Sequence, residues 1–243
     1  MEENPLDKRR IEQRKQQARN WAEGMSGALQ KKKEDQFDPD KLDPLQKEDY
    51  EDALLVFTGG KDYFKDAVFV DIAAGLGSRV HDVVTDLGGK VMNLDISADA
   101  VRYLQETKGE PGAVADAFQL PLADNSMDGL ISANFINSSA MMGEEGTEYI
   151  ENTEDFIREV ARVLKQGGIF IQSNFGAGEK VKAYTINALL TAGFGNRLEI
   201  TPLNHNQRGY DSIADQNEIL KGWGTPFAFI ARKTTDPYDD SRF

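Results

Sequence analysis

The chain contains no cysteine and only two histidines, His81 and His205, among its 243 residues. The lack of cysteine excludes disulfide bonds, thiolate metal sites and a cysteine nucleophile. Zinc sites draw most of their ligands from cysteine and histidine, so two histidines are too few for a multi-histidine centre. We therefore expect a protein that holds no metal.

Long apolar runs are also absent. No stretch reaches the roughly 18 consecutive apolar residues that a membrane-spanning helix needs. The N-terminus begins Met-Glu-Glu-Asn-Pro, continues highly charged and lacks the apolar core of a secretory signal. These absences predict a cytoplasmic protein without a membrane partner.

Positive charge is scarce after the first 50 residues. The net charge is −13, and the residues after position 50 carry 17 basic and 29 acidic side chains. A nucleic-acid binder needs a cationic surface that replaces the counterions of the phosphates. The acidic balance therefore argues against a nucleic-acid partner and favours neutral or cationic small molecules. The run Lys31-Lys32-Lys33 is typical of a solvated linker rather than a nucleic-acid arm.

The first 45 residues differ in pattern from the rest of the chain. Residues 5–34 are polar with a thin apolar stripe at helical spacing, and residues 47–58 predict a second helix that ends at Gly59-Gly60. Pro39 and Pro44 interrupt the chain between the two helices. We expect an N-terminal helical extension or lid over residues 1–45 and one larger domain over residues 46–243.

Strand and helix patterns alternate along that larger domain. The predicted strands are 67–72, 90–94, 112–115, 127–133, 169–172, 197–201 and 227–231, and the predicted helices between them are 79–87, 98–107, 153–164 and 181–192. This alternation predicts an α/β fold with a seven-stranded, mostly parallel sheet that is covered by helices on both faces.

The strongest functional signal lies in residues 68–78. A buried strand ends in Asp71, and small residues follow at positions 73, 74, 75 and 77 before a helix begins. Small residues let the backbone approach a ligand at the carboxyl edge of a parallel sheet, and the helix N-terminus supplies free amide donors. A plain tight turn is the alternative explanation for the same residues.

A second acidic residue follows at the end of the next predicted strand. Asp95 lies 24 residues after Asp71, near the separation of about 20 residues at which a strand-end carboxylate reaches ribose hydroxyls in nucleotide-binding folds. A carboxylate can accept hydrogen bonds from both hydroxyls of a vicinal diol. Asp95 could instead cap the helix that follows, and the two roles are compatible.

These segments belong to an ordered series that resembles the class I S-adenosylmethionine-dependent methyltransferases, in their small-molecule branch. The likeness covers residues 69–233, and the blocks that carry it are residues 70–77, 93–97, 115–132, 158–168, 192–194 and 229–233. The resemblance implies a Rossmann-like fold, S-adenosylmethionine as the cofactor and methyl transfer to a small-molecule acceptor.

The resemblance also implies roles for single positions. Asp71 would support the glycine loop near the methionine amino group, Asp95 would bind the ribose, and Asp116 would accept from the exocyclic amine of adenine. The implied cofactor-binding residues are Asp71, Ala73, Ala74, Gly75, Gly77, Asp95, Ile96, Ser97, Asp116, Ala117, Phe118, Asn134 and Phe135.

Three features of the sequence narrow what the resemblance implies about the cofactor and the substrate. Ala73 stands where the family usually has glycine, so we expect the methionine end to be held differently. Residues 134–137 replace the adjacent prolines that mark methyltransferases acting on nucleic-acid bases and planar amides, which argues against such substrates. Val80 occupies the third small position of the dinucleotide fingerprint, which disfavours an NAD-type oxidoreductase.

Methyl transfer from a sulfonium is an in-line displacement in which the cofactor carries the reactive group, while the protein aligns the nucleophile and excludes water. A base is needed only when the nucleophile arrives protonated. The candidates for this role are Tyr50, Asn137 and His205, although an exposed loop position explains His205 better than a catalytic role does. The identity of the acceptor is not encoded in these motifs.

Two other functions stay open at this point. The same fold could catalyse an intramolecular cyclisation or elimination within the cofactor, which would release methylthioadenosine rather than S-adenosylhomocysteine. The chain could also be a non-catalytic paralogue. We expect a monomer or a homodimer.

Overall fold

The computed structural model describes residues 5–33, 47–136, 148–174, 179–194, 199–201 and 227–234. One seven-stranded sheet with the strand order β3-β2-β1-β4-β5-β7-β6 organises these residues. The strands are β1 (Val68–Ile72), β2 (Lys90–Asp95), β3 (Gly112–Val114), β4 (Met127–Ala133), β5 (Leu164–Asn174), β6 (Glu199–Thr201) and β7 (Phe227–Arg232). β7 runs antiparallel to both β5 and β6, whereas the other neighbours are parallel. The predicted fold class is confirmed.

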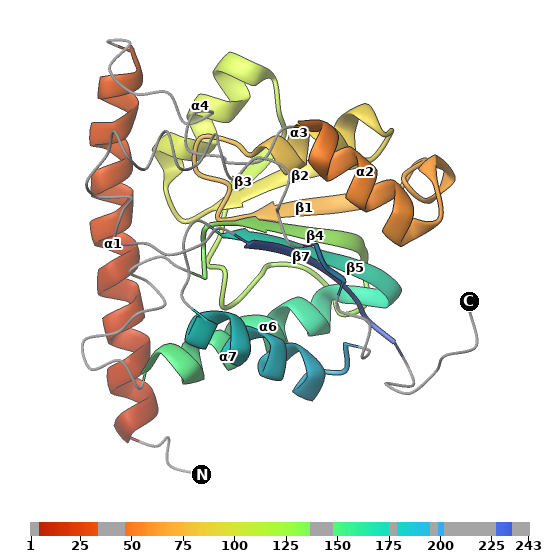
Figure 1. Ribbon diagram of the computed structural model, residues 1–243. Helices are drawn as coiled ribbons and strands as arrows, with labels where there is room; N and C mark the ends of the chain where they lie inside the picture. Colours follow the sequence, from red (N-terminus) through yellow and green to blue (C-terminus); the bar gives the residue numbers. More distant parts are fainter. Residues whose placement is uncertain are drawn as a thin grey trace.

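The helices pack on both faces of this sheet (Figure 1). They are α1 (Pro5–Lys33), α2 (Lys47–Thr58), α3 (Arg79–Asp86), α4 (Ala98–Lys108), α6 (Glu148–Val163) and α7 (Glu179–Thr191). α2, α3 and α4 cover one face, and α6 and α7 cover the other (Figure 1). Within the described ranges, no helix combines the length and the apolar character needed to cross a bilayer.

Each predicted strand and helix has a counterpart, and the largest difference lies at β5. The sequence predicts a strand over 169–172, but β5 begins at Leu164, directly after α6. Leu164 pairs with Met127 and Ile169 with Gly129, so β5 carries extra residues opposite a short stretch of β4. Gly167 has a φ of 79° in this irregular stretch, a conformation that glycine adopts without strain.

Alternation along β1 divides the core into two apolar layers. Val70 and Ile72 belong to the cluster that contains Phe156 and Val160 of α6. Phe69 belongs to the opposite cluster, with Val83 of α3. Successive side chains of a strand point to opposite faces, so Asp71 shares the α3 face with Phe69. A carboxylate is thus buried directly under α3.

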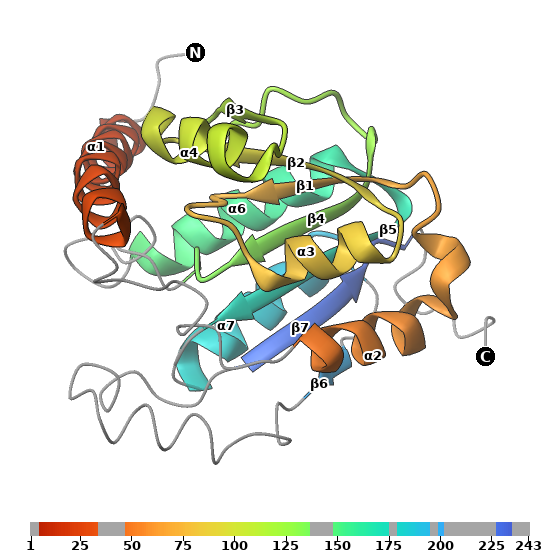
Figure 2. The ribbon, with the colours of Figure 1, turned by 90° about the horizontal axis from the view of Figure 1, so that it is seen from above.

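α1 lies outside these layers, along the edge of the sheet at which β1 and β4 end (Figures 1 and 2). Met25 and Leu29 of α1 form a small apolar cluster with Leu76 and Ala100. Ser26 donates a hydrogen bond to Asp99 of α4. The N-terminal helix therefore packs against the carboxyl edge of the sheet.

Close packing of β1 and β4 predicts the cost of one added methyl group. Gly129 pairs with Phe69, and a Cβ at position 129 would overlap the Phe69 ring. We expect Gly129→Ala to lower the free energy of unfolding by about 1–3 kcal/mol in urea titrations. The control is Gly24→Ala, in α1 with no atom near the added Cβ, which should be neutral or stabilise by up to about 1 kcal/mol. Equal stabilities of wild type and Gly129→Ala would contradict this packing.

Candidate functional site

Four segments that follow parallel strands meet at the carboxyl edge of the sheet and form a pocket. Ala73 follows β1, and residues 115–118 follow β3. Asp95 is the last residue of β2 and is followed by Ile96, while residues 133–135 begin at the last residue of β4. Ligands of open α/β sheets bind at this edge, where the strand order reverses. In this sheet the reversal lies between β1 and β4, so topology alone places a binding site here.

The loop after β1 alternates left-handed residues. Ala73, Gly75 and Gly77 have φ values of 55°, 54° and 100°. This conformation costs a residue with a Cβ about 1–2 kcal/mol, which explains why glycine is usual at the position of Ala73. Ala73 lines the pocket. The departure noted in the sequence thus has a structural consequence, because this chain keeps a strained alanine next to the pocket.

Asp95 holds this loop from the neighbouring strand. Its Oδ2 accepts from the Gly75 amide at 2.9 Å, and its Oδ1 accepts from the Ser97 amide at 2.7 Å. The side chain is 1% exposed and lines the pocket. Burial raises the pKa of Asp95, and the two amides oppose that shift. Each carboxylate oxygen has two lone pairs, so Asp95 can still accept from ribose hydroxyls.

Ser97 caps α4, since its hydroxyl accepts from the Ala100 amide at 3.3 Å. Ser97, and not Asp95, is therefore the N-cap residue of α4. Ser97 and Ala74 are buried and do not line the pocket. They support the loop backbone instead of facing a ligand.

Asp71 lies beneath the loop on the α3 face. Its Oδ2 accepts from the Ser78 hydroxyl at 2.8 Å and lies 3.8 Å from Nδ1 of the buried His81. Burial raises the pKa of Asp71 to about 7, while the Ser78 hydrogen bond opposes the shift. Asp71 supports the loop, as the resemblance implied, and is not part of the pocket lining.

The segment after β3 forms the opposite wall. The Ala115 amide donates to the Asp95 carbonyl at 3.0 Å, which fixes the start of the segment to β2. Oδ1 of Asp116 accepts from the Phe118 amide at 2.9 Å. Asp116, Ala117 and Phe118 all line the pocket. A ring, an amide and a carboxylate at one end suit a flat, hydrogen-bonding base such as adenine.

α1 closes the pocket from outside the sheet. Arg14, Ala18 and Trp21, which are spaced by helical turns on one face of α1, line it. The Arg14 guanidinium lies 4.4 Å from the centroid of the Phe118 ring, a cation–π contact. Arg14 also pairs with Asp155 of α6 at 3.2 Å. A cation, a small residue and an indole of the N-terminal helix thus complete the wall.

Most of the residues implied for the cofactor meet at this pocket. Those that line it are Ala73, Asp95, Ile96, Asp116, Ala117, Phe118, Asn134 and Phe135. Gly75 and Gly77 are covered by other side chains, since a Cβ at Gly75 would meet Met25 and one at Gly77 would meet Lys108. The sequence did not indicate Arg14, Ala18 or Ala115 as lining residues. Only the helical spacing of Arg14 with Ala18 and Trp21 could have suggested its place.

Of the three residues proposed as bases, Tyr50 alone falls within the described residues. Tyr50 of α2 is 4% exposed and packs in the cluster with Leu54 and Phe64, and it is not among the residues that line the pocket. Asn137 and His205 fall outside the described residues. Among the residues whose placement is described, no group of three or more histidine, aspartate or glutamate side chains could hold a metal ion.

The pKa of Asp71 makes stability depend on pH in a defined direction. A folded-state pKa near 7, against about 3.9 in an unfolded chain, means that the folded state binds this proton more tightly. The stability from Asp71 is therefore lost as pH rises from about 4 to about 7, by up to about 1.4 kcal/mol per pH unit. Relative to wild type, Asp71→Asn should become more stable across that window.

Urea titrations at several pH values measure this difference. His81, Glu110, Asp95 and Lys108 act on the same site and are present in both proteins, so the comparison reports on Asp71. Parallel stability curves for wild type and Asp71→Asn would contradict the prediction.

Comparisons with known proteins connect this geometry to a family. Residues 70–172, which include every strand-end segment of the pocket, match the family model described as a methyltransferase domain. Phosphoethanolamine N-methyltransferase 2 of Caenorhabditis elegans is 25% identical over 179 residues, which is 69% of this chain and 38% of that protein. The chain therefore spans less than half the length of this curated relative.

Solved structures share the fold. A Galdieria sulphuraria protein assigned as a sarcosine dimethylglycine methyltransferase matches with a TM-score of 0.55 at 16% identity, over 76% of this chain and 84% of that one. Geranyl diphosphate C-methyltransferase of Streptomyces coelicolor matches with a TM-score of 0.53 at 14% identity, over 76% and 79% of the two chains. The matched domain, the sheet order and the strand-end pocket together support the resemblance to the class I S-adenosylmethionine-dependent methyltransferases.

Proposed function

We propose that the protein transfers the methyl group of S-adenosylmethionine to a small-molecule acceptor. The observation that carries this proposal is the pocket itself, which the segments after β1, β2, β3 and β4 line together with one face of α1. The bound cofactor supplies an electrophilic methyl group. The residues of the chain have to orient it, exclude water and admit the acceptor.

The lining residues fit such a cofactor in order along the pocket. Asp95 is placed to accept from the ribose, and Ile96 and Phe118 offer apolar surfaces for the adenine ring. Oδ1 of Asp116 is engaged by the Phe118 amide, so Oδ2 can accept from an exocyclic amine. Asn134, at a φ of 62°, lies on the β4 side of the pocket. This leaves the Ala73 and Asn134 side for the methionine end and the acceptor.

The covering helix supports a small acceptor. Arg14, Ala18 and Trp21 of α1 line the pocket from the solvent side, so a polymeric substrate would have to displace α1 before it reached the strand ends. The net charge of −13 is unfavourable for a nucleic acid. The relatives named as phosphoethanolamine and geranyl diphosphate methyltransferases take small molecules, by their names. We further propose that residues 1–45 act as a lid for this site.

A general base is a separate proposal. Asn137 and His205 keep their place as candidates from the sequence. Tyr50 is the weakest of the three because its side chain points from α2 into the core and packs there. An acceptor whose nucleophile arrives unprotonated needs no base, and alignment by the pocket then suffices.

Asp95 provides the most direct test of cofactor binding. Asp95→Asn removes the charge and places an amide group where two backbone amides donate. We expect the affinity for S-adenosylhomocysteine in calorimetry to fall about 10–100-fold, the equivalent of one or two charged hydrogen bonds. Asp66→Asn is the matched control, because the Asp66 carboxylate is exposed and pairs with Lys90 at 2.9 Å. Unchanged affinity in Asp95→Asn would contradict the placement of the ribose.

Product analysis tests the reaction and the size of the acceptor. The protein is incubated with S-adenosylmethionine and either the low-mass filtrate or the retained macromolecules of a cell extract. We expect S-adenosylhomocysteine to form with the filtrate only. Formation of methylthioadenosine would indicate non-methyl chemistry on the cofactor, and turnover with the macromolecules alone would contradict a small acceptor.

A further inference from the structure

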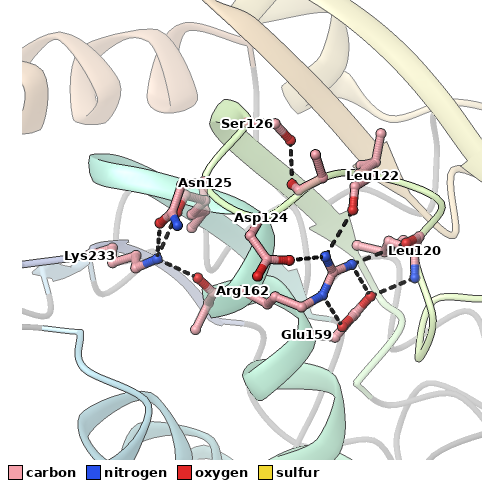
Figure 3. Close-up of polar contacts among 11 residues, drawn as sticks. Leu120, Leu122, Asp124, Asn125, Ser126, Glu159, Arg162 and Lys233 are labelled. Atoms are coloured by element: carbon pink, nitrogen blue, oxygen red, sulfur yellow. Dashed lines mark hydrogen bonds and ion pairs between the residues drawn. The ribbon is translucent and has the colours of Figure 1, made fainter.

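Arg162, near the end of α6, makes five hydrogen bonds, of which three reach the chain between β3 and β4 and two go to Glu159 of the same helix (Figure 3). Its guanidinium donates to the carbonyl oxygens of Leu120 and Leu122 at 3.1 and 2.8 Å. It donates to Oδ1 of Asp124 at 2.6 Å, and to both carboxylate oxygens of Glu159 at 2.8 and 2.7 Å. A planar fork with five donors is suited to hold several acceptors in one geometry.

Glu159 completes the contact from the same helix. Its Oε1 accepts from the Leu120 amide at 2.7 Å, while Arg162 donates to the Leu120 carbonyl. Both backbone polar groups of Leu120 are thus held by one ion pair on α6. The Leu120 side chain is 4% exposed and lies in the same core cluster as Phe156 of α6.

Leu120 ends the short turn that carries the adenine wall of the pocket. The turn starts at Ala115, which is fixed to the Asp95 carbonyl. It is closed by the Gln119 amide, which donates to the Asp116 carbonyl at 3.1 Å. Only Gln119 separates Phe118 from Leu120, so a shift of Leu120 is transmitted to the Phe118 ring and the Asp116 carboxylate. None of the residues of the ion pair lines the pocket.

The neighbouring carboxylates favour the charged form of Arg162. The hydrogen bonds from Glu159 and Asp124 raise the pKa of Arg162 above its usual value, so the guanidinium keeps its charge. Its side chain is 32% exposed and that of Glu159 is 13% exposed. Exposed ion pairs contribute little to stability, about 0–1 kcal/mol. The value of this pair therefore lies more in fixing the loop geometry than in stabilising the fold.

We propose that Arg162 and Glu159 are positioning residues for cofactor recognition, which hold the turn 115–120 so that Asp116 and Phe118 face the adenine ring. This inference rests on the proposed function, because it assumes that the pocket binds an adenosyl cofactor. Neither residue touches the cofactor itself. The two residues act through the backbone of Leu120.

A second cation, which contacts the same loop between β3 and β4, provides the control. Lys233, just after β7, donates to the carbonyls of Ala161 and Leu164 at 2.6 and 2.7 Å and to Oδ1 of Asn125 at 2.9 Å (Figure 3). It fixes the C-terminal end of α6 and the later part of the loop, and none of these three hydrogen bonds reaches the turn 115–120. Loss of Lys233 should reduce stability without changing the adenine wall.

The experiment compares two ligands in calorimetry, S-adenosylhomocysteine and S-inosylhomocysteine, in which a carbonyl oxygen replaces the exocyclic amine. Wild type should prefer the adenosyl ligand, since Asp116 accepts from the amine. Arg162→Met should bind the adenosyl ligand roughly tenfold more weakly, a loss of about 1.4 kcal/mol, and should bind the inosyl ligand nearly as wild type does. The preference for adenine should therefore shrink. Lys233→Met should lower the thermal midpoint and keep the wild-type preference.

Two conservative variants extend the test. Arg162→Lys keeps the charge but offers one ammonium in place of the fork, so it should recover part of the preference. Glu159→Gln keeps an acceptor for the Leu120 amide and weakens the hold on Arg162, so it should cause a smaller loss of the same selective kind. It also serves as the test if Arg162→Met does not fold.

The outcomes separate this inference from the proposed function. If wild type does not bind S-adenosylhomocysteine, the proposed function fails. If wild type binds and prefers adenine while the Arg162 and Glu159 variants keep that preference, the positioning role is overturned. The same holds if Lys233→Met loses the preference to the same extent, because the effect would then be a general loss of order.

Discussion

The pocket depends on one buried carboxylate that accepts hydrogen bonds from two separate segments. Asp95 binds the Gly75 amide of the loop after β1 and the Ser97 amide at the start of α4. Burial alone would favour the neutral form of such a side chain, as the raised pKa of Asp95 shows. Two backbone donors offset part of that desolvation cost. The carboxylate thus joins two neighbouring strand ends and presents its remaining acceptor capacity to a ligand.

Other carboxylates around the pocket also accept hydrogen bonds that hold the loops. Asp71 accepts from the Ser78 hydroxyl below the glycine loop, and Asp116 accepts from the Phe118 amide in the adenine wall. Glu159 and Arg162 hold Leu120 from α6. Irregular segments have backbone groups that no ladder or helix satisfies, and here side chains from regular elements satisfy several of them. Side chains of the sheet and of α6 thereby fix the conformation of the loops that form the pocket.

Much of this could be predicted from the sequence because it depends on local pattern. Apolar runs at strand spacing and glycine stops were sufficient for the strands, the helices and a mostly parallel sheet, and the family resemblance implied most of the pocket lining. The bulge at the start of β5 was missed because its extra residues are defined by pairing with β4. The roles of Arg14 and Arg162 were missed for the same reason. Each is one charged residue on a polar helix face, and only tertiary packing shows that it reaches Phe118 or Leu120.

The two ends of α1 are held by interactions of unequal strength, and this bears on how a ligand reaches the pocket. Arg10 and Arg14 pair with Asp155 of α6 at 3.0 and 3.2 Å, and Arg14 adds its contact with Phe118. The side chains of these ion pairs are 13–20% exposed, and the cost of removing their charges from water offsets much of their attraction. A cation–π contact contributes about 0.5–2 kcal/mol. At the other end Met25 and Leu29 are buried against α4 and the glycine loop, and each such side chain contributes about 1.5–3 kcal/mol. The apolar end is therefore the stronger anchor. An opening of α1 would separate the arginines from α6 first, and it would uncover the adenine wall before the glycine loop.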